Sequence, residues 1–139
     1  MSTYVDTSTL LKLLVDEPGT SIARDVWTAA SALTSVPLTQ VEARAGLAAA
    51  ARSDRITQQQ LGQAKRMLAD LVWQLDLIEV SDELVALAGD VAEDDALRGY
   101  DAVHLAAALL AGCDVLTSAD RRLLAAAEQR GLLVVDTNG

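Results

Sequence analysis

Four acidic residues, Asp6, Glu42, Asp101 and Asp120, stand where a parallel α/β fold would bring them together. Asp6 ends a short β-prone run, Glu42 and Asp120 open helix-like stretches that follow such runs, and Asp101 opens the helix that leads back into a later run. A helix that runs antiparallel to its strands begins at the edge where those strands end. All four carboxylates are therefore expected at the carboxyl edge of one sheet, where open α/β sheets place their sites.

Carboxylates gathered in this way repel one another and need a cation. Two unit charges about 4 Å apart cost about 4 kcal/mol at an effective dielectric of about 20. Oxygen ligands, one cysteine and one histidine favour Mg²⁺ or Mn²⁺ over zinc. Two such ions activate a water and stabilise the leaving oxygen of a phosphodiester. The four acids therefore predict metal-dependent phosphodiester hydrolysis, and neutralising one of them, as in Asp6→Asn, is expected to stabilise the metal-free protein.

Taken singly, each of the four acids also has a structural interpretation as a turn, capping or first-turn residue. For Glu42 this is a capping box with Thr39. The same topology brings Asp82 and Glu83 to the carboxyl edge, so topology alone does not select the site. These two acids are excluded only if the strand expected at residues 76–80 is an outer one.

The elements that must position the acids alternate along the chain. Short β-prone runs predict strands at residues 3–6, 34–38, 76–80, 114–117 and 132–135. Apolar residues at three- and four-residue spacing predict helices at residues 8–15, 20–32, 39–52, 57–74, 82–96, 101–111 and 120–130. Strand followed by helix, repeated, predicts an α/β fold with a mostly parallel sheet and helices on both faces.

Composition limits the class of protein further. Without repeats, low-complexity tracts or linkers, the 139 residues predict one domain over 1–139. A net charge of −9 opposes nucleic-acid binding by general phosphate neutralisation unless bound metals supply the positive charge, and it favours a basic protein partner. The absence of a leader-like segment and of an apolar run of roughly 20 residues predicts a cytoplasmic protein that does not contact membranes.

Four sequence blocks resemble those of the PIN-domain family. They are TYVDTSTLLKLL, LTQVEARAGL, LRGYDAVHLAAALL and DVLTSADRRLL. Each block carries one of the four acids, and the blocks follow in the family's order over essentially the whole chain. Within the family, they resemble most the toxin ribonucleases of VapBC toxin-antitoxin modules.

The resemblance implies a three-layer sandwich, in which a five-stranded parallel sheet of order 3-2-1-4-5 is flanked by about seven helices. This order puts the strand at residues 76–80 on the edge and removes Asp82 and Glu83 from the site. The resemblance also implies that the four acids bind Mg²⁺ or Mn²⁺ and that the protein is an endoribonuclease leaving a 5′-phosphate and a 3′-hydroxyl. As a toxin, such a protein is silenced by a cognate antitoxin, here expected to insert a basic segment.

Residues beside the acids extend the candidate site. Hydroxyls that could orient an acid or a metal-bound water, or alternatively cap a helix, belong to Thr7, Ser8, Thr117 and Ser118. The candidates for binding RNA phosphates are Arg44, Arg98, Arg121 and Arg122, with Arg44 and Arg121 favoured because each lies within a turn of a proposed ligand. His104 lies one turn after Asp101, and we expect it in the apolar packing layer rather than as a general base.

A homodimer is expected from the family and from an Ala- and Leu-rich helical surface at residues 45–51 and 61–73. Three other functions remain open. One is a PIN-fold ribonuclease in constitutive RNA processing. The others are a haloacid-dehalogenase-like phosphatase and a receiver-like Mg²⁺-binding domain, which require a second acid near Asp6 or a lysine after a late strand; neither is present.

Overall fold

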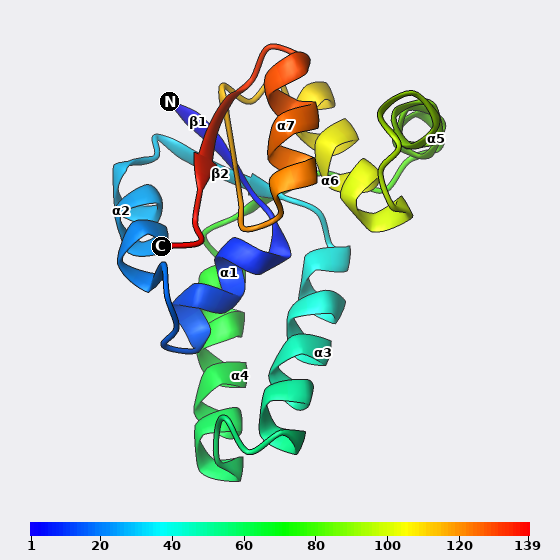
Figure 1. Ribbon diagram of the computed structural model, residues 1–139. Helices are drawn as coiled ribbons and strands as arrows, with labels where there is room; N and C mark the ends of the chain where they lie inside the picture. Colours follow the sequence, from blue (N-terminus) through cyan, green and yellow to red (C-terminus); the bar gives the residue numbers. More distant parts are fainter.

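The computed structural model describes residues 1–139 as a parallel sheet with helices on both faces (Figure 1). The strands are β1 (Ser2–Val5), β2 (Ala32–Ser35), β3 (Asp76–Leu77), β4 (Val115–Ser118) and β5 (Leu133–Asp136). The helices are α1 (Thr7–Leu14), α2 (Thr20–Ala29), α3 (Leu38–Arg52), α4 (Gln58–Val72), α5 (Asp82–Asp95), α6 (Gly99–Leu110) and α7 (Arg121–Gln129). The strand order β3-β2-β1-β4-β5, with all pairs parallel, confirms the predicted topology.

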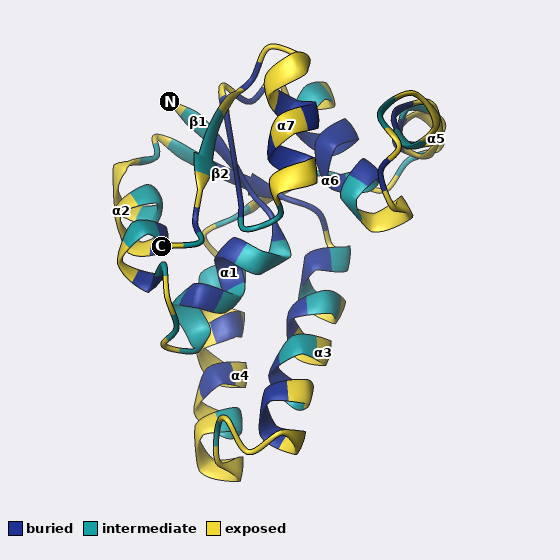
Figure 2. Ribbon diagram, in the orientation of Figure 1, coloured by how far each residue is buried: buried dark blue, intermediate teal, exposed yellow.

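The side chains of β1 divide the core into two parts, because successive residues of a strand point to opposite faces. Tyr4 is buried against a cluster from α5, α6 and α7 that includes Leu105. Val5 belongs to the cluster on the other face, with Leu10 of α1 and Leu68 of α4. Figure 2 shows both buried layers beside the sheet, which confirms the three-layer sandwich. No helix combines the length and the apolar character needed to cross a membrane.

Three strands lie within one residue of the predicted ranges, and two, β2 and β3, differ by more. β2 lies at Ala32–Ser35 rather than at residues 34–38, because Pro37 has no amide hydrogen for the ladder and stands directly before α3. β3 has two residues rather than the five predicted at 76–80, since its only neighbour is β2 and the pairing ends with β2 itself. The edge position of β3 is as expected, and it keeps the two acids that open α5 away from the crevice between β1 and β4.

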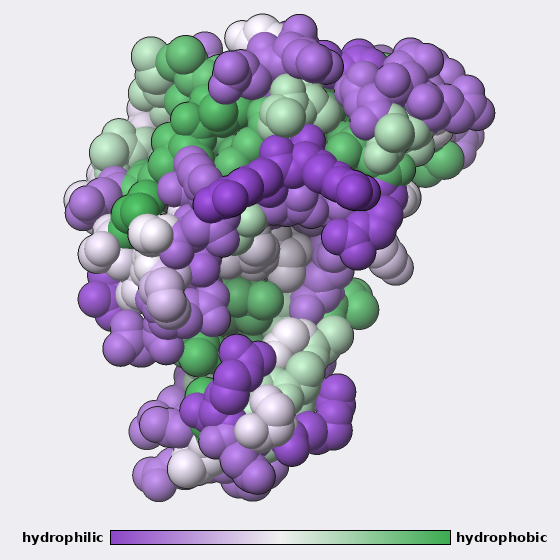
Figure 3. Space-filling view, in the orientation of Figure 1, coloured by the Kyte–Doolittle hydropathy of each residue, from purple (hydrophilic) through white to green (hydrophobic).

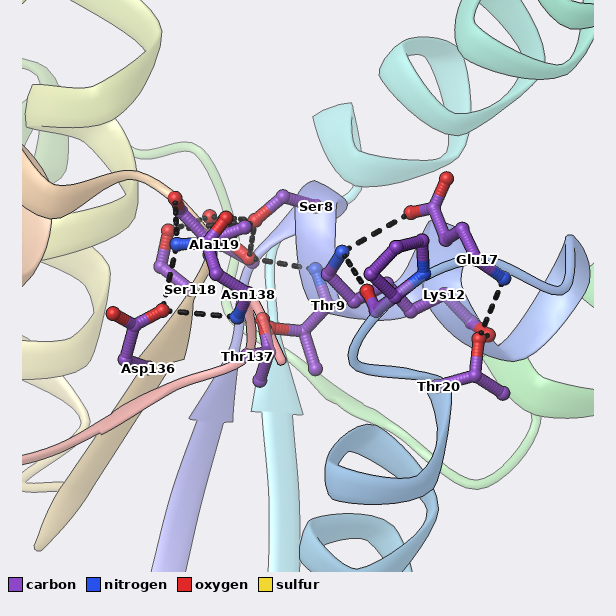
Figure 4. A network of polar contacts seen from close by, with 12 residues as sticks. Ser8, Thr9, Lys12, Glu17, Thr20, Ser118, Ala119, Asp136, Thr137 and Asn138 are labelled. Carbon is purple, nitrogen blue, oxygen red and sulfur yellow. Dashed lines mark hydrogen bonds and ion pairs between the residues drawn. The ribbon is translucent and has the colours of Figure 1, made fainter.

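The segment after β5 packs against the loop that follows β4 (Figure 4). Gly19 has a φ of 94°, and a Cβ at this position would lie 1.8 Å from the carbonyl oxygen of Thr137, so only glycine fits. The side-chain amide of Asn138 donates to the carbonyl of Ala119 at 2.8 Å. The C-terminal segment thus supports the backbone next to Asp120.

Candidate active site

Asp6 lies directly after β1, where it is 4% exposed and forms the N-cap of α1. Its Oδ1 accepts from the backbone amide of Thr9 at 3.0 Å. The Ser8 hydroxyl lies 2.8 and 2.9 Å from the two carboxylate oxygens, and the Ser118 hydroxyl donates to Oδ2 at 2.6 Å. Each oxygen of the Asp6 carboxylate thus has two hydrogen-bond contacts, which fix the orientation of the side chain. Asp6, and not Ser8, is therefore the residue that caps the first helix.

Glu42 lies near the start of α3, and its Oε1 accepts two hydrogen bonds. One comes from the Thr7 hydroxyl and the other from Nε2 of His104, both at 2.9 Å, while no hydrogen bond reaches Oε2. Partial burial raises the pKa of Glu42, but the hydrogen bonds from His104 and from the Thr7 hydroxyl act in the opposite direction, and the pKa lies below its usual value. The capping box suggested for Thr39 is absent, because the Thr39 hydroxyl pairs with that of Ser35.

His104 is buried, as expected, but its surroundings are not apolar. The side chain is 3% exposed, and its Nδ1 lies 2.7 Å from the hydroxyl of Tyr4. With Glu42 at Nε2, both ring nitrogens have polar partners. The expectation of an apolar packing position was wrong in this respect, because the spacing from Asp101 gives no information about a tyrosine in β1.

Asp101 and Asp120 form the other side of the site, with Arg98 between them. Asp120 caps α7, and its Oδ1 accepts from the amides of Arg122 and Leu123, which leaves Oδ2 free of hydrogen bonds. The Arg98 guanidinium lies 3.6 Å from Asp101 and 3.8 Å from Asp120. Burial raises the pKa of Asp101, and the negative charge of Asp120 raises it further, against the opposing effect of Arg98. This pair of acids thus already recruits a positive group.

Two of the four acids, Glu42 and Asp101, line a cleft of about 670 Å³, together with Arg98, Gly99, Tyr100 and Val103. As the side chains stand, no three His, Cys, Asp or Glu residues are close enough together to hold one ion. The donor set still suits Mg²⁺ or Mn²⁺, because it consists of oxygen atoms, and Oε2 of Glu42 and Oδ2 of Asp120 accept no protein hydrogen bond. Arg98, with its side chain 84% exposed, is free to leave the position where a cation would be required.

Comparison with known proteins identifies the family, since residues 3–129 match the model of the PIN domain. The chain belongs to the PIN-domain family. It is 41% identical to the ribonuclease VapC45 of Mycobacterium tuberculosis over 133 residues, which cover 94% of this chain and 92% of that protein. This agrees with the resemblance of the four sequence blocks.

Two solved structures have the same fold. PAE2754 from Pyrobaculum aerophilum aligns with a TM-score of 0.74 and 26% identity over 97% of this chain and 84% of that one. A toxin-antitoxin complex from Klebsiella pneumoniae contains a chain that aligns with a TM-score of 0.70 and 18% identity, over 97% of both chains. The fold predicted from the sequence is therefore also the fold of these two solved structures.

Three of the four hydroxyls singled out from the sequence contact one of the candidate acids, and one does not. Thr7 donates to Glu42, and Ser8 and Ser118 donate to the carboxylate after β1. The hydroxyl of Thr117 instead donates to the Tyr4 carbonyl at 3.1 Å, because strand alternation turns it away from its neighbour Ser118. Thr117 therefore supports the β1–β4 pairing rather than an acid.

The four candidate arginines lie in different surroundings. Arg98 lines the cleft, whereas Arg121 lies 3.7 Å from Asp136 on another side of α7. Arg44 and Arg122 are exposed on helix surfaces and do not line the cleft. The sequence favoured Arg44 and Arg121, but the arginine that the fold brings to the acids is Arg98.

Proposed function

We propose that this PIN domain, spanning residues 1–139, is a Mg²⁺- or Mn²⁺-dependent endoribonuclease whose metal ligands are Asp6, Glu42, Asp101 and Asp120. The observation that carries the proposal is the grouping of carboxylates from separate segments: Glu42 and Asp101 line one cleft, the charges of Asp120 and Asp6 act on Asp101, and an exposed arginine is the only counter-charge beside Asp101 and Asp120. The 41% identity to a protein named as a ribonuclease supports RNA as the substrate.

The chain's own residues prepare the carboxylates for this role. When bound, the metal ions supply positive charge to the phosphodiester and lower the pKa of water. Ser8 and Ser118 hold Asp6, while Thr7 and His104 hold Glu42. The cap of α7 fixes Asp120. No side chain of the site has to act as a nucleophile.

Arginines bind the substrate in this proposal. Arg98 is exposed beside the cleft, so it exchanges its two carboxylate partners for an RNA phosphate when cations neutralise the acids. Arg44, Arg121 and Arg122 are then candidates for phosphates farther along the strand, since they lie outside the cleft lining. This arrangement lets an acidic protein bind a polyanion.

Cleavage of single-stranded RNA by the purified full chain tests the enzymatic proposal. We expect cleavage with Mg²⁺ or Mn²⁺, none in EDTA, and a loss of several orders of magnitude in Asp101→Asn. The matched control is Asp82→Asn, which neutralises an exposed acid in the first turn of the outer helix α5 and should cleave like the wild type. Cleavage that persists in EDTA would contradict the proposal.

We also propose that the protein is the toxin of a type II toxin-antitoxin module. The net charge of −9 and the acids of the cleft fit an antitoxin that inserts a basic segment, and the Klebsiella pneumoniae structure of the same fold is a toxin-antitoxin complex. Expression alone should arrest growth, and co-expression of a small neighbouring gene should restore it. Normal growth during expression of cleavage-competent protein would favour constitutive RNA processing instead.

A homodimer is the remaining part of the proposal. Residues 45–51 and 61–73 lie on the α3–α4 hairpin, which extends away from the sheet and exposes Trp73 to 89% (Figure 1). Figure 3 shows another apolar area, where α2 and β5 lie and where Leu133 is 56% exposed. Light scattering should give twice the 14.6 kDa chain mass, and Trp73→Ser should shift it to one chain if the hairpin forms the interface. A monomer at tens of micromolar wild type would reject the dimer.

A further inference from the structure

A chain of buried polar groups connects the interior of the sheet to Glu42. It begins at the hydroxyl of Tyr4, which is 0% exposed, and passes to Nδ1 of His104 at 2.7 Å. From Nε2 of the same ring it reaches Oε1 of Glu42 at 2.9 Å. The two rings meet edge to face, with centroids 5.7 Å apart, so packing also holds the imidazole in place.

The direction of each hydrogen bond follows from the groups at the two ends. An ionised Glu42 can only accept, so the proton on the near side of His104 must be on Nε2. In a neutral imidazole Nδ1 is then an acceptor, and the hydroxyl of Tyr4 is the donor to it. The Tyr4 hydroxyl is the only hydrogen-bond partner of Nδ1 in His104, so Tyr4→Phe removes the contact that favours this tautomer at Nδ1.

A second donor completes the geometry at the carboxylate. Thr7 also donates to Oε1, at 2.9 Å, so both protein hydrogen bonds hold the same oxygen of Glu42. The other oxygen, Oε2, keeps its lone pairs while the carboxylate is fixed in rotation. This is the arrangement that a ligand needs if a cation is to find it already oriented.

We infer that Tyr4 and His104 are positioning residues: the Tyr4 hydroxyl favours, from the far side of the ring, the Nε2–H tautomer of His104 that Glu42 requires, and His104 in turn orients Glu42 with Oε2 free for the metal. The inference rests on the proposed function of this site. It assigns His104 a role other than proton transfer to substrate, because the ring is 3% exposed, does not line the cleft and has both nitrogens engaged.

The tautomer can be observed directly, because His104 is the only histidine of the chain. Long-range proton–nitrogen correlation spectra of the metal-free protein, recorded at increasing pH until the ring is neutral, should show one ring with its proton on Nε2. In Tyr4→Phe this preference should weaken toward a mixture of tautomers. A wild-type ring protonated on Nδ1, or a spectrum that Tyr4→Phe leaves unchanged, overturns the inference.

Metal affinity tests the consequence for Glu42. In calorimetric titrations of the full chain with Mn²⁺, His104→Leu should bind about 10- to 100-fold more weakly than the wild type. His104→Gln can still present an amide donor to Glu42, so it should lose much less affinity. Thr20→Val removes a different buried hydroxyl, one that donates to the carbonyl of Lys12, and should bind like the wild type.

The pattern of these affinities separates positioning from packing. Thermal melts of each variant in EDTA establish that it is folded before it is titrated. Wild-type affinity in His104→Leu overturns the inference. An equal loss in His104→Gln and His104→Leu also overturns it, because the ring would then act by filling space rather than by donating a hydrogen bond.

Failure of this inference and failure of the proposed function give different results. If the wild type binds Mn²⁺ and cleaves RNA while His104→Leu binds as tightly, only the positioning role is wrong. If the wild type binds no Mn²⁺, the metal-site proposal is wrong and so is the metal part of this inference. The ring spectra then still decide whether the Tyr4 hydroxyl sets the tautomer.

Discussion

The two halves of the candidate site hold their carboxylates in different ways. Asp6 and Glu42 are held by hydroxyl, amide and imidazole donors that the fold supplies from several elements. Asp101 and Asp120 share a single guanidinium, that of Arg98, whose side chain is 84% exposed. The first half is therefore organised by donors from several elements, whereas the second half has only the α7 cap at Asp120 and one exposed guanidinium.

The pKa values of Glu42 and Asp101, one from each half, show the same difference. The donors at Glu42 lower its pKa despite burial, whereas burial and a neighbouring carboxylate raise the pKa of Asp101. A lowered carboxyl pKa contributes stability above the unfolded-state value, and this contribution is lost as the pH falls through the folded-state value. A raised pKa has the opposite sign, so ionised Asp101 costs stability as the pH rises. Replacing the carboxylate of Glu42 with an amide should therefore lower the stability of the metal-free protein, whereas the same change at Asp101 should raise it.

The largest expected effect is on catalysis, where the two halves should not differ. Asp6→Asn and Asp120→Asn should each reduce single-turnover RNA cleavage by several orders of magnitude, because each removes one metal ligand. Rates at saturating Mn²⁺ and RNA provide the measurement. If one of these variants keeps wild-type cleavage, that half of the site does not take part in the chemistry.

The next effect concerns the organised half and reverses the expectation from the sequence. Asp6→Asn should lower the free energy of unfolding in EDTA by about 1–3 kcal/mol, because an amide group replaces an oxygen that now accepts from Ser8, Ser118 or Thr9. Urea denaturation in EDTA measures this free energy of unfolding. The rise in melting temperature on adding Mn²⁺ should also shrink. A variant more stable than the wild type in EDTA would show that repulsion outweighs the donors.

A smaller effect of opposite sign is expected in the other half. Asp101→Asn should raise the free energy of unfolding of the metal-free protein by up to about 1 kcal/mol near pH 7, since it removes a charge that burial and Asp120 disfavour. The gain should disappear as the pH falls below the unfolded-state pKa of Asp101, where the carboxyl is protonated in both states. Glu42→Gln should instead destabilise near pH 7. If the free energy of unfolding changes in the same direction in both variants, the proposed difference between the two halves is wrong.

The smallest effect is assigned to the arginine. Arg98→Gln should tighten Mn²⁺ binding a few-fold, because the cation no longer displaces a guanidinium from Asp101 and Asp120. It should also raise the KM for RNA a few-fold if the same guanidinium binds phosphate. Arg24→Gln removes an exposed arginine of α2 and should change neither value. Unchanged Mn²⁺ affinity in Arg98→Gln would show that this ion pair does not compete with metal.

Several features of the molecule follow from local sequence patterns. The alternation of β-prone and helical segments predicted the parallel sheet, and the four sequence blocks predicted its strand order through their resemblance to a family. The same blocks selected four acids that the fold does bring to one edge. Boundaries were less certain where a pattern had no sharp end, as at β2 and the two-residue β3.

The sequence by itself thus predicted the fold class, because this depends on periodicity and on the order of elements along the chain, and it predicted the strand order and the group of acids through the resemblance of four blocks to a family. Only the tertiary structure decided what each acid contacts. Tyr4 and His104 are 100 residues apart, and Ser118 is 112 residues from Asp6. No spacing rule joins such pairs. Their hydrogen bonds depend on strand register and on helix packing against the sheet, which a local pattern does not contain.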